Sequence, residues 1–220
     1  MNNKGILWDM DGVLVDTGEL HYQSWITTLS DFNIPFSRDF FRETFGMNNW
    51  SILNKLLGHT PDQALYQAIS DQKEKQYRQC AHGHVKPLPG VLELLHLAKS
   101  KGLRQSISSS APQENIDVIV DELNIRPFFD AIVSGNKLNG KPAPDVFLAS
   151  AKAISVPAQN CLVIEDAIAG VEGAKRAGML CLAVTNTNSK ENLQHADIIV
   201  DSLVEVDSKF LDQLFQKIPE

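Results

Sequence analysis

Two aspartates, Asp9 and Asp11, follow the apolar stretch of residues 5–8 in the segment WDMDGVLVDT. Side chains at positions i and i+2 of an extended chain point the same way, so the two carboxylates converge. Adjacent carboxylates repel each other unless a proton or a cation lies between them. The pair therefore predicts a site that transfers protons or binds a metal ion.

Polar residues also end later apolar runs. Ser108 and Ser109 end one of them, and Glu165 and Asp166 end another. Lys141 precedes a predicted helix in the loop GKPAPD. Carboxylate oxygens suit Mg²⁺, whereas a lysine, a serine hydroxyl and main-chain N–H groups suit a phosphoryl group. The residue types together indicate Mg²⁺-dependent phosphoryl transfer.

The elements that must position these residues form two patterns. From residue 87 onward, short apolar runs alternate with helical periodicity, which is typical of a parallel sheet covered on both faces. The predicted strands after residues 5–8 are 105–108, 131–133, 161–164, 180–184 and 198–200, and the predicted helices are 91–100, 112–123, 144–154, 167–177 and 203–217. In such sheets ligands bind outside the carboxyl ends of the strands, which is where the polar residues lie.

Residues 18–82 differ, because they show no convincing strand. The pattern predicts helices over 19–32, 37–45, 48–57 and from Thr60-Pro61 to about Cys80. We therefore expect an α/β, Rossmann-like, mainly parallel sheet between helices, made by residues 1–16 and 86–220. A helical bundle, residues 17–85, is inserted into it, with hinges near residues 14–17 and 83–88.

Composition limits the partners. The 220-residue chain is 43% apolar and 21% charged with a formal net charge of -7, which argues against nucleic acid. No apolar stretch is long enough to span a membrane, and the first four residues are too polar for a signal peptide. Three cysteines without a C-x-x-C pattern favour buried thiols in a reducing compartment, so we expect a cytoplasmic protein.

The four polar clusters, taken in order, resemble the motifs of the haloacid dehalogenase superfamily. Asp9-Met10-Asp11-Gly12-Val13 is similar to its nucleophile motif, Ser108 to the serine of the second, Lys141 to the lysine of the third and Glu165-Asp166 to the acidic pair of the fourth. The resemblance extends from residue 4 to about residue 200. It implies that Asp9 attacks phosphorus and becomes an aspartyl phosphate, and that Asp11 is the general acid and base.

The same resemblance implies the binding roles. Ser108 and Lys141 would bind the transferring phosphoryl group, and, from their place before the next helix, the amides of Ser109 and Ser110 would offer further N–H donors. Asp9, the main-chain carbonyl of Asp11 and Asp166 would hold Mg²⁺, with Glu165 nearby. The helical insertion would be a cap that closes over the site and excludes water.

Within the superfamily the chain is most similar to the β-phosphoglucomutase-like branch. Thr17 and His21 match its D-T-x-E-x-H segment, which helps to position the general acid, and Lys73 resembles its cap lysine. Read without the resemblance, Thr17 could be a helix N-cap, His21 a surface histidine and Lys73 part of a solvated helix face. Asn49 stands where mutases of this branch have an arginine that grips a second phosphate.

These observations predict a phosphatase that acts on a small phosphorylated metabolite, above all a sugar phosphate, as a monomer. A β-phosphoglucomutase converting β-glucose 1-phosphate to glucose 6-phosphate is the main alternative, since it shares the core chemistry. A non-catalytic binding or regulatory module is a lesser alternative. A pure binder would have no need to keep Asp9, Asp11, Lys141 and Asp166 together.

Overall fold

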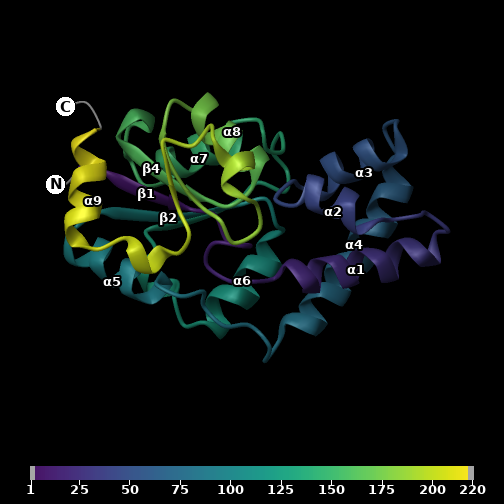
Figure 1. Ribbon diagram of the computed structural model, residues 1–220. Coiled ribbons are helices and arrows are strands. Elements are labelled where there is room, and N and C mark those ends of the chain that lie inside the picture. Colours follow the sequence, from purple (N-terminus) through teal and green to yellow (C-terminus); the bar gives the residue numbers. More distant parts are fainter. Residues whose placement is uncertain (1–2, 218–220) are drawn as a thin grey trace.

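The computed structural model, which describes residues 3–217, contains a six-stranded sheet in the order β3-β2-β1-β4-β5-β6 with parallel pairing throughout (Figure 1). The strands are β1 (Gly5–Trp8), β2 (Arg104–Ser109), β3 (Ala131–Ser134), β4 (Cys161–Glu165), β5 (Leu180–Val184) and β6 (Ile198–Val200). The predicted parallel sheet, with a helical insertion between its first and second strands, is confirmed.

Helices cover both faces of the sheet, as the continuous apolar strands require. Helices α7 (Asp145–Ala153) and α8 (Ile168–Arg176) lie over one face, and α5 (Val91–Ser100), α6 (Gln113–Glu122) and α9 (Ser208–Gln216) lie over the other. Strand β1 is central, and Ile6, Leu7 and Trp8 are fully buried. Both faces of β1 are thus covered by helices, and its carboxyl end points toward the insertion.

Strand order brings the polar residues together. Strand β1 pairs with β2 on one side and with β4 on the other, with Trp8 opposite both Ile107 and Ile164. Asp9 therefore leaves the sheet beside the carboxyl ends of β2 and β4. These ends carry Ser109 and Glu165.

The insertion consists of α1 (Gly18–Asp31), α2 (Arg38–Thr44), α3 (Asn49–Leu57) and α4 (Gln63–Ala81), which lie together beyond the carboxyl ends of the strands (Figure 1). It has a core of its own around Trp25, Leu29 and Leu53. Side-chain caps start α2, α3 and α4: Ser37 accepts a hydrogen bond from the main chain of α2, and Asn48 does the same for α3. The four helices of the insertion are thus held together by an apolar core that is separate from the apolar clusters of the sheet.

Two predicted helix boundaries are wrong. The fourth cap helix begins at Gln63 rather than at Thr60-Pro61, because the Asp62 carboxylate caps it by accepting from Leu65 N at 2.9 Å. The last predicted helix, 203–217, is two elements: a 3-10 turn, η4 (Leu203–Glu205), and α9, which Asp207 caps. Further 3-10 turns are η1 (Arg126–Phe128), η2 (Ala158–Asn160) and η3 (Lys190–Leu193).

The insertion rests on the core through side-chain hydrogen bonds. Asn48 Nδ2 donates to the carbonyl of Leu138 at 3.2 Å, and Ser110 Oγ donates to the carbonyl of Gly46 at 2.7 Å. Cys161 and Cys181 are buried free thiols, whereas Cys80 is exposed. Among the helices of residues 3–217, none combines the length and the apolar character that a membrane crossing needs.

Candidate active site

Lys141 joins the ends of two neighbouring strands. Its ammonium group lies 2.5 Å from Asp9 Oδ1 and 2.6 Å from Glu165 Oε1, and all three side chains are almost completely buried. Burial disfavours its charge, but the two carboxylates hold the pKa of Lys141 above its usual value. Glu165 is fixed in turn by the main-chain N–H groups of Asp166 and Ala167, which donate to its Oε2 at 2.7 and 2.8 Å.

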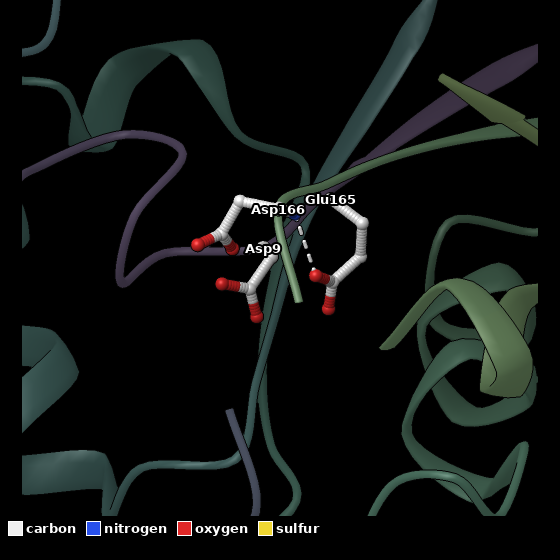
Figure 2. A group of neighbouring side chains, drawn as sticks. All are labelled: Asp9, Glu165 and Asp166. Atoms are coloured by element: carbon white, nitrogen blue, oxygen red, sulfur yellow. Dashed lines mark hydrogen bonds between the residues drawn. The ribbon is translucent and has the colours of Figure 1, made fainter. Parts of the chain in front are cut away.

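Asp9, Glu165 and Asp166 form a buried acidic cluster in which oxygen atoms of the three side chains lie within 4.8 Å of one another (Figure 2). In Figure 2, Glu165 turns back toward the main chain of Asp166, while the carboxylates of Asp9 and Asp166 lie next to each other. Asp166 Oδ2 accepts a hydrogen bond from Thr187, but Asp166 Oδ1 has no partner among the described residues. Gly12, at φ 93°, makes room for this carboxylate, because a Cβ there would collide with it.

The cluster fits a bound cation. Burial raises the pKa of Asp9 to about 8, with Lys141 opposing the shift and Glu165 adding to it. Burial, Glu165 and Asp9 also hold the pKa of Asp166 well above its usual value. The three carboxylates carry more negative charge than the single ammonium group of Lys141 balances, and one oxygen of Asp166 has no hydrogen-bond donor among the described residues. Because all the free donor atoms are oxygens, the cluster suits Mg²⁺.

Asp11 faces the cap instead. Thr17 Oγ1 donates to Asp11 Oδ1, and His21 Nε2 lies 3.2 Å from the same oxygen. Although burial opposes ionisation, His21 and Thr17 hold the pKa of Asp11 below its usual value. Thr17 occupies the N-cap position of α1, as its alternative interpretation predicts, but its hydroxyl makes no capping bond and donates to Asp11 instead. His21 is nine-tenths buried, which excludes the surface-histidine interpretation.

A buried network extends from Asp11 into the cap. Lys73 Nζ lies 2.9 Å from His21 Nδ1 and 2.7 Å from Glu74 Oε1. Lys73 and Glu74 both belong to α4, and both side chains are buried. The solvated-face interpretation of Lys73 is therefore wrong. Asn49 Nδ2 donates to Glu74 Oε1 at 2.7 Å, and Asn115 of core helix α6 donates to the other oxygen. Burial opposes ionisation, yet Lys73 and His21 hold the pKa of Glu74 below its usual value.

The two serines predicted at the phosphate lie on different sides of β2. Ser108 is fully buried, and its hydroxyl donates to Ser150 Oγ of helix α7 at 2.7 Å. Ser109 and Ser110 instead line the cavity that contains Asp9. The structure therefore does not bring Ser108 into the site, and the serine beside Asp9 is Ser109.

Core and cap enclose a cavity of about 40 Å³. Its polar lining comprises Asp9, Asp11, His21, Asn49, Lys73, Glu74, Ser109 and Ser110, and Trp25, Phe41, Phe45, Met47 and Ile52 are prominent in its apolar lining. This space admits a few water molecules, not a sugar phosphate. The cap therefore covers Asp9 in this structure and leaves too little space for a substrate of that size.

A family model described as "Haloacid dehalogenase-like hydrolase" matches residues 6–184, which is most of the chain and carries every element of the acidic cluster. The chain belongs to this family. Its helical cap and its relatives place it in the β-phosphoglucomutase and CbbY-like subfamily.

Three relatives illustrate the range of this haloacid dehalogenase-like hydrolase subfamily. Protein SUPPRESSOR OF QUENCHING 1 of Arabidopsis thaliana is 35% identical over 87% of this chain, which spans only 19% of that protein's length. The β-phosphoglucomutase of Bacillus subtilis is 32% identical, with 90% of this chain and 88% of that protein covered. A phosphorylated carbohydrates phosphatase of Thermotoga maritima is 28% identical, with 80% and 82% covered.

A solved structure has the same fold over its whole length. The crystal structure of a β-phosphoglucomutase from Clostridium difficile has a TM-score of 0.87 and 28% identity, with 97% of each chain covered. The buried acidic cluster of this hydrolase is consistent with the metal site of its family. The relatives include both a phosphatase and mutases, so family membership alone leaves the two activities open.

Sequence reasoning missed three residues that shape the site. Glu74 and Asn115 tie the cap to core helix α6, and Thr187 holds one oxygen of Asp166. Glu74 and Asn115 lie in polar stretches whose composition is typical of an exposed helix face. Thr187 lies after strand β5 in a segment that matches no motif. Their positions depend on how α4 docks and how the loop after β5 folds back, which local sequence does not specify.

Proposed function

We propose that this haloacid dehalogenase-like hydrolase is a Mg²⁺-dependent phosphatase of a small phosphorylated metabolite, with sugar phosphates as its first candidates. The observation that carries the proposal is the contact of Asp9 with Lys141 inside a buried acidic cluster, in which one oxygen of Asp166 has no partner among the described residues. A binding protein gains nothing from three buried carboxylates around one lysine, since burying unbalanced charge is costly. Catalysis gives a reason to keep them.

Asp9 is the proposed nucleophile. Its free oxygen attacks phosphorus, the bond to the leaving oxygen breaks, and an aspartyl phosphate forms. Lys141 and the donors at Ser109 stabilise the charge that builds up on the phosphoryl oxygens. A water molecule then attacks the intermediate, the bond between Asp9 and phosphorus breaks, and phosphate leaves.

Asp11 is the proposed general acid and base. It donates a proton to the leaving oxygen and later accepts one from the attacking water. The contacts with Thr17 and His21 favour its carboxylate, which is the form needed for the second step. An entering phosphoryl group brings negative charge, which raises a carboxyl pKa and loads the proton for the first step.

Mg²⁺ is the proposed cofactor, held by Asp9, the main-chain carbonyl of Asp11 and Asp166. When bound, it supplies positive charge that keeps Asp9 ionised and offsets the charge of the phosphoryl group. Glu165 contributes by holding Lys141, because hydrogen bonds occupy both of its oxygens.

The cap side chains that line the cavity favour hydrolysis over the mutase reaction. A mutase must bind a bisphosphate, which needs a second positively charged side chain to bind the second phosphate. The described lining of the reaction cavity contains no arginine, and Asn49 is bonded to the Glu74 carboxylate. The mutase remains the second candidate, because the Bacillus subtilis enzyme named above is among the similar proteins.

The test is phosphate release from a broad panel of phosphomonoesters with Mg²⁺, and with EDTA as the control. In parallel, β-glucose 1-phosphate is supplied with a bisphosphate activator, and glucose 6-phosphate is measured. We expect Mg²⁺-dependent phosphate release from several sugar phosphates. Formation of glucose 6-phosphate faster than phosphate release would overturn the preference for hydrolysis, and no turnover of any compound would favour a binding module.

A further inference from the structure

A larger hollow, the distal groove, lies beside the reaction cavity between cap and core. It has a volume of about 980 Å³, which is within the range of small-molecule sites. Helices α3 and α4 line its cap side, and the start of α6 and the loop 136–139 line its core side. Asn49 and Glu74 line both spaces, so this hydrogen-bonded pair separates them. The small reaction cavity already requires the cap to shift for a substrate, and such a shift at this pair would join the two spaces, so that a substrate with its phosphoryl group at Asp9 extends into the groove.

One side chain in the distal groove lacks a partner. Ser70 is 7% exposed and lines the groove, and its Oγ makes no hydrogen bond with any described residue. Buried hydroxyls are nearly always hydrogen-bonded, because leaving one unpaired costs free energy. The Ser70 oxygen is itself covered, so a ligand hydroxyl that displaces the neighbouring side chains would supply the missing bond.

An aromatic surface lies near this serine. Trp50 is 37% exposed, and its ring packs edge-to-face against Tyr66 with the centroids 5.0 Å apart. Both rings line the groove, together with amide side chains such as Gln67 and Asn136. Aromatic faces bind the C–H faces of sugar rings, while amides and hydroxyls bond to their edges.

The charges of the distal groove disfavour a second phosphate. Four carboxylates line it against three basic side chains. The Glu74 carboxylate lies at the passage from the reaction cavity, and the guanidinium of Arg78 donates to Asn115 Oδ1 at 2.8 Å. A carboxylate at the passage repels a phosphate but accepts hydrogen bonds from hydroxyl groups.

We propose that the distal groove binds a neutral, hydroxyl-rich sugar ring, so that the preferred substrates are phosphomonoesters of disaccharide size. This inference rests on the phosphatase function proposed above. The phosphoryl group lies at Asp9, the sugar that carries it meets Asn49 and Glu74, and the second ring packs on Trp50 with a hydroxyl at Ser70. Monosaccharide phosphates fill only the reaction cavity and leave the distal groove empty. The second phosphate of a bisphosphate is repelled by the carboxylates of the groove.

The test compares matched substrates that differ by one neutral ring. Trehalose 6-phosphate is compared with glucose 6-phosphate, and sucrose 6-phosphate, which carries its phosphate on the fructose ring, with fructose 6-phosphate. Fructose 1,6-bisphosphate tests a charged distal group, and p-nitrophenyl phosphate reports the chemistry without the groove. We expect kcat/KM to be higher for at least one disaccharide phosphate than for its monosaccharide partner, and lowest among the sugars for the bisphosphate.

Two variants connect the preference to the groove. Trp50→Ala and Ser70→Ala should each lower kcat/KM for the preferred disaccharide phosphate by about twofold to tenfold. Turnover of p-nitrophenyl phosphate should not change, and Trp50→Phe, which keeps an aromatic face, should restore most of the loss.

The outcomes separate the two proposals. If the wild-type protein fails on p-nitrophenyl phosphate and on every sugar phosphate, the phosphatase function is wrong and the groove assignment falls with it. If it hydrolyses these compounds but prefers neither disaccharide phosphate, or prefers the bisphosphate, the groove assignment alone is overturned. The same holds if Trp50→Ala lowers the turnover of mono- and disaccharide phosphates equally.

Discussion

In the core half of the site three carboxylates share one ammonium group, whereas in the cap-facing half two carboxylates face an ammonium group and an imidazole. The core half consists of Asp9, Lys141, Glu165 and Asp166, and the cap-facing half of Asp11, His21, Lys73 and Glu74. The core half leaves an oxygen of Asp166 without a partner, while Asp11 and Glu74 each accept several hydrogen bonds. Only the core half therefore needs a cation from outside.

The two halves also differ in how they are held. The core residues follow strands of one parallel sheet, where main-chain ladders fix their spacing. The cap meets the core through side-chain hydrogen bonds, such as Asn48 to Leu138 and Ser110 to Gly46, and through apolar contacts of Tyr77 and Ala81 at the end of α4. This contrast suits an enzyme in which the reacting groups must be held in a fixed geometry while the cap must move to admit the substrate.

The largest effect is expected from Asp9→Asn in the core half. An amide cannot attack phosphorus, so turnover should fall by about four orders of magnitude or more, as with other nucleophiles. Asp16→Asn is the matched control, because Asp16 is an exposed carboxylate at the hinge. Phosphate release and circular dichroism measure activity and fold. Residual activity near that of the wild type would show that the nucleophile lies elsewhere.

Mg²⁺ should stabilise the core half. At a Mg²⁺ concentration a hundredfold above Kd, we expect the melting temperature to rise by about 5–10 °C. Because the pKa of Asp9 is raised to about 8, protons compete with the metal below that pH. The shift should therefore be small near pH 5 and grow as the pH rises through 8.

Asp166→Asn checks the origin of this effect by calorimetry. The variant removes one carboxylate from a crowded buried cluster, so without Mg²⁺ it should be at least as stable as the wild type. With Mg²⁺ it should show little or no rise in melting temperature. A rise equal to that of the wild type would contradict the assignment of the metal to this cluster.

A smaller effect is expected from Thr17→Val in the cap-facing half. The variant keeps the shape of a fully buried side chain but removes the donor to Asp11. Loss of a hydrogen bond to a charged group should lower kcat by roughly tenfold to a hundredfold. It should also raise the pKa of Asp11, so the pH above which kcat/KM declines should move upward.

Thr28→Val is the control for this variant, since Thr28 is a fully buried threonine of helix α1, which Thr17 precedes, and its hydroxyl bonds to Gln76 instead. It should leave the pH profile unchanged. An unchanged profile in Thr17→Val as well would mean that Thr17 supports the fold of the hinge and does not tune Asp11.

The same contrast explains which features could be predicted. Strands 161–164, 180–184 and 198–200 are short apolar runs, and burial on both faces of a parallel sheet produces this signal directly. Once the strand order is known, the proximity of the charged residues that follow the strands can also be predicted. Ser108 and Ser109 could not be separated in this way, because a run of buried serines carries no alternation that shows which face each occupies.

The cap-facing half was harder to predict for a physical reason. Lys73 and Glu74 lie in the polar run Asp71–Lys75, which has the composition of a solvated helix face. Their burial depends on partners from α1, α3 and α6, whose docking is a tertiary property. Buried ion pairs of this kind become visible only when the helices are packed.

The smallest effect is expected from Asn48→Asp, which tests how loosely the cap is held. The two ends of this amide do different work: Oδ1 accepts from Ser51 N at 2.9 Å and caps α3, and Nδ2 donates to the carbonyl of Leu138. Aspartate keeps the capping oxygen but replaces the donor with an oxygen that repels the carbonyl. Since one neutral hydrogen bond is lost, KM should rise by roughly twofold to tenfold with kcat little changed.

Asp62→Asn, the reverse exchange at the exposed cap of α4, should leave KM unchanged. If kcat falls as strongly as in Thr17→Val while KM stays constant, the Asn48 bond serves the chemistry rather than closure, and the division between a fixed core half and a movable cap would have to be abandoned.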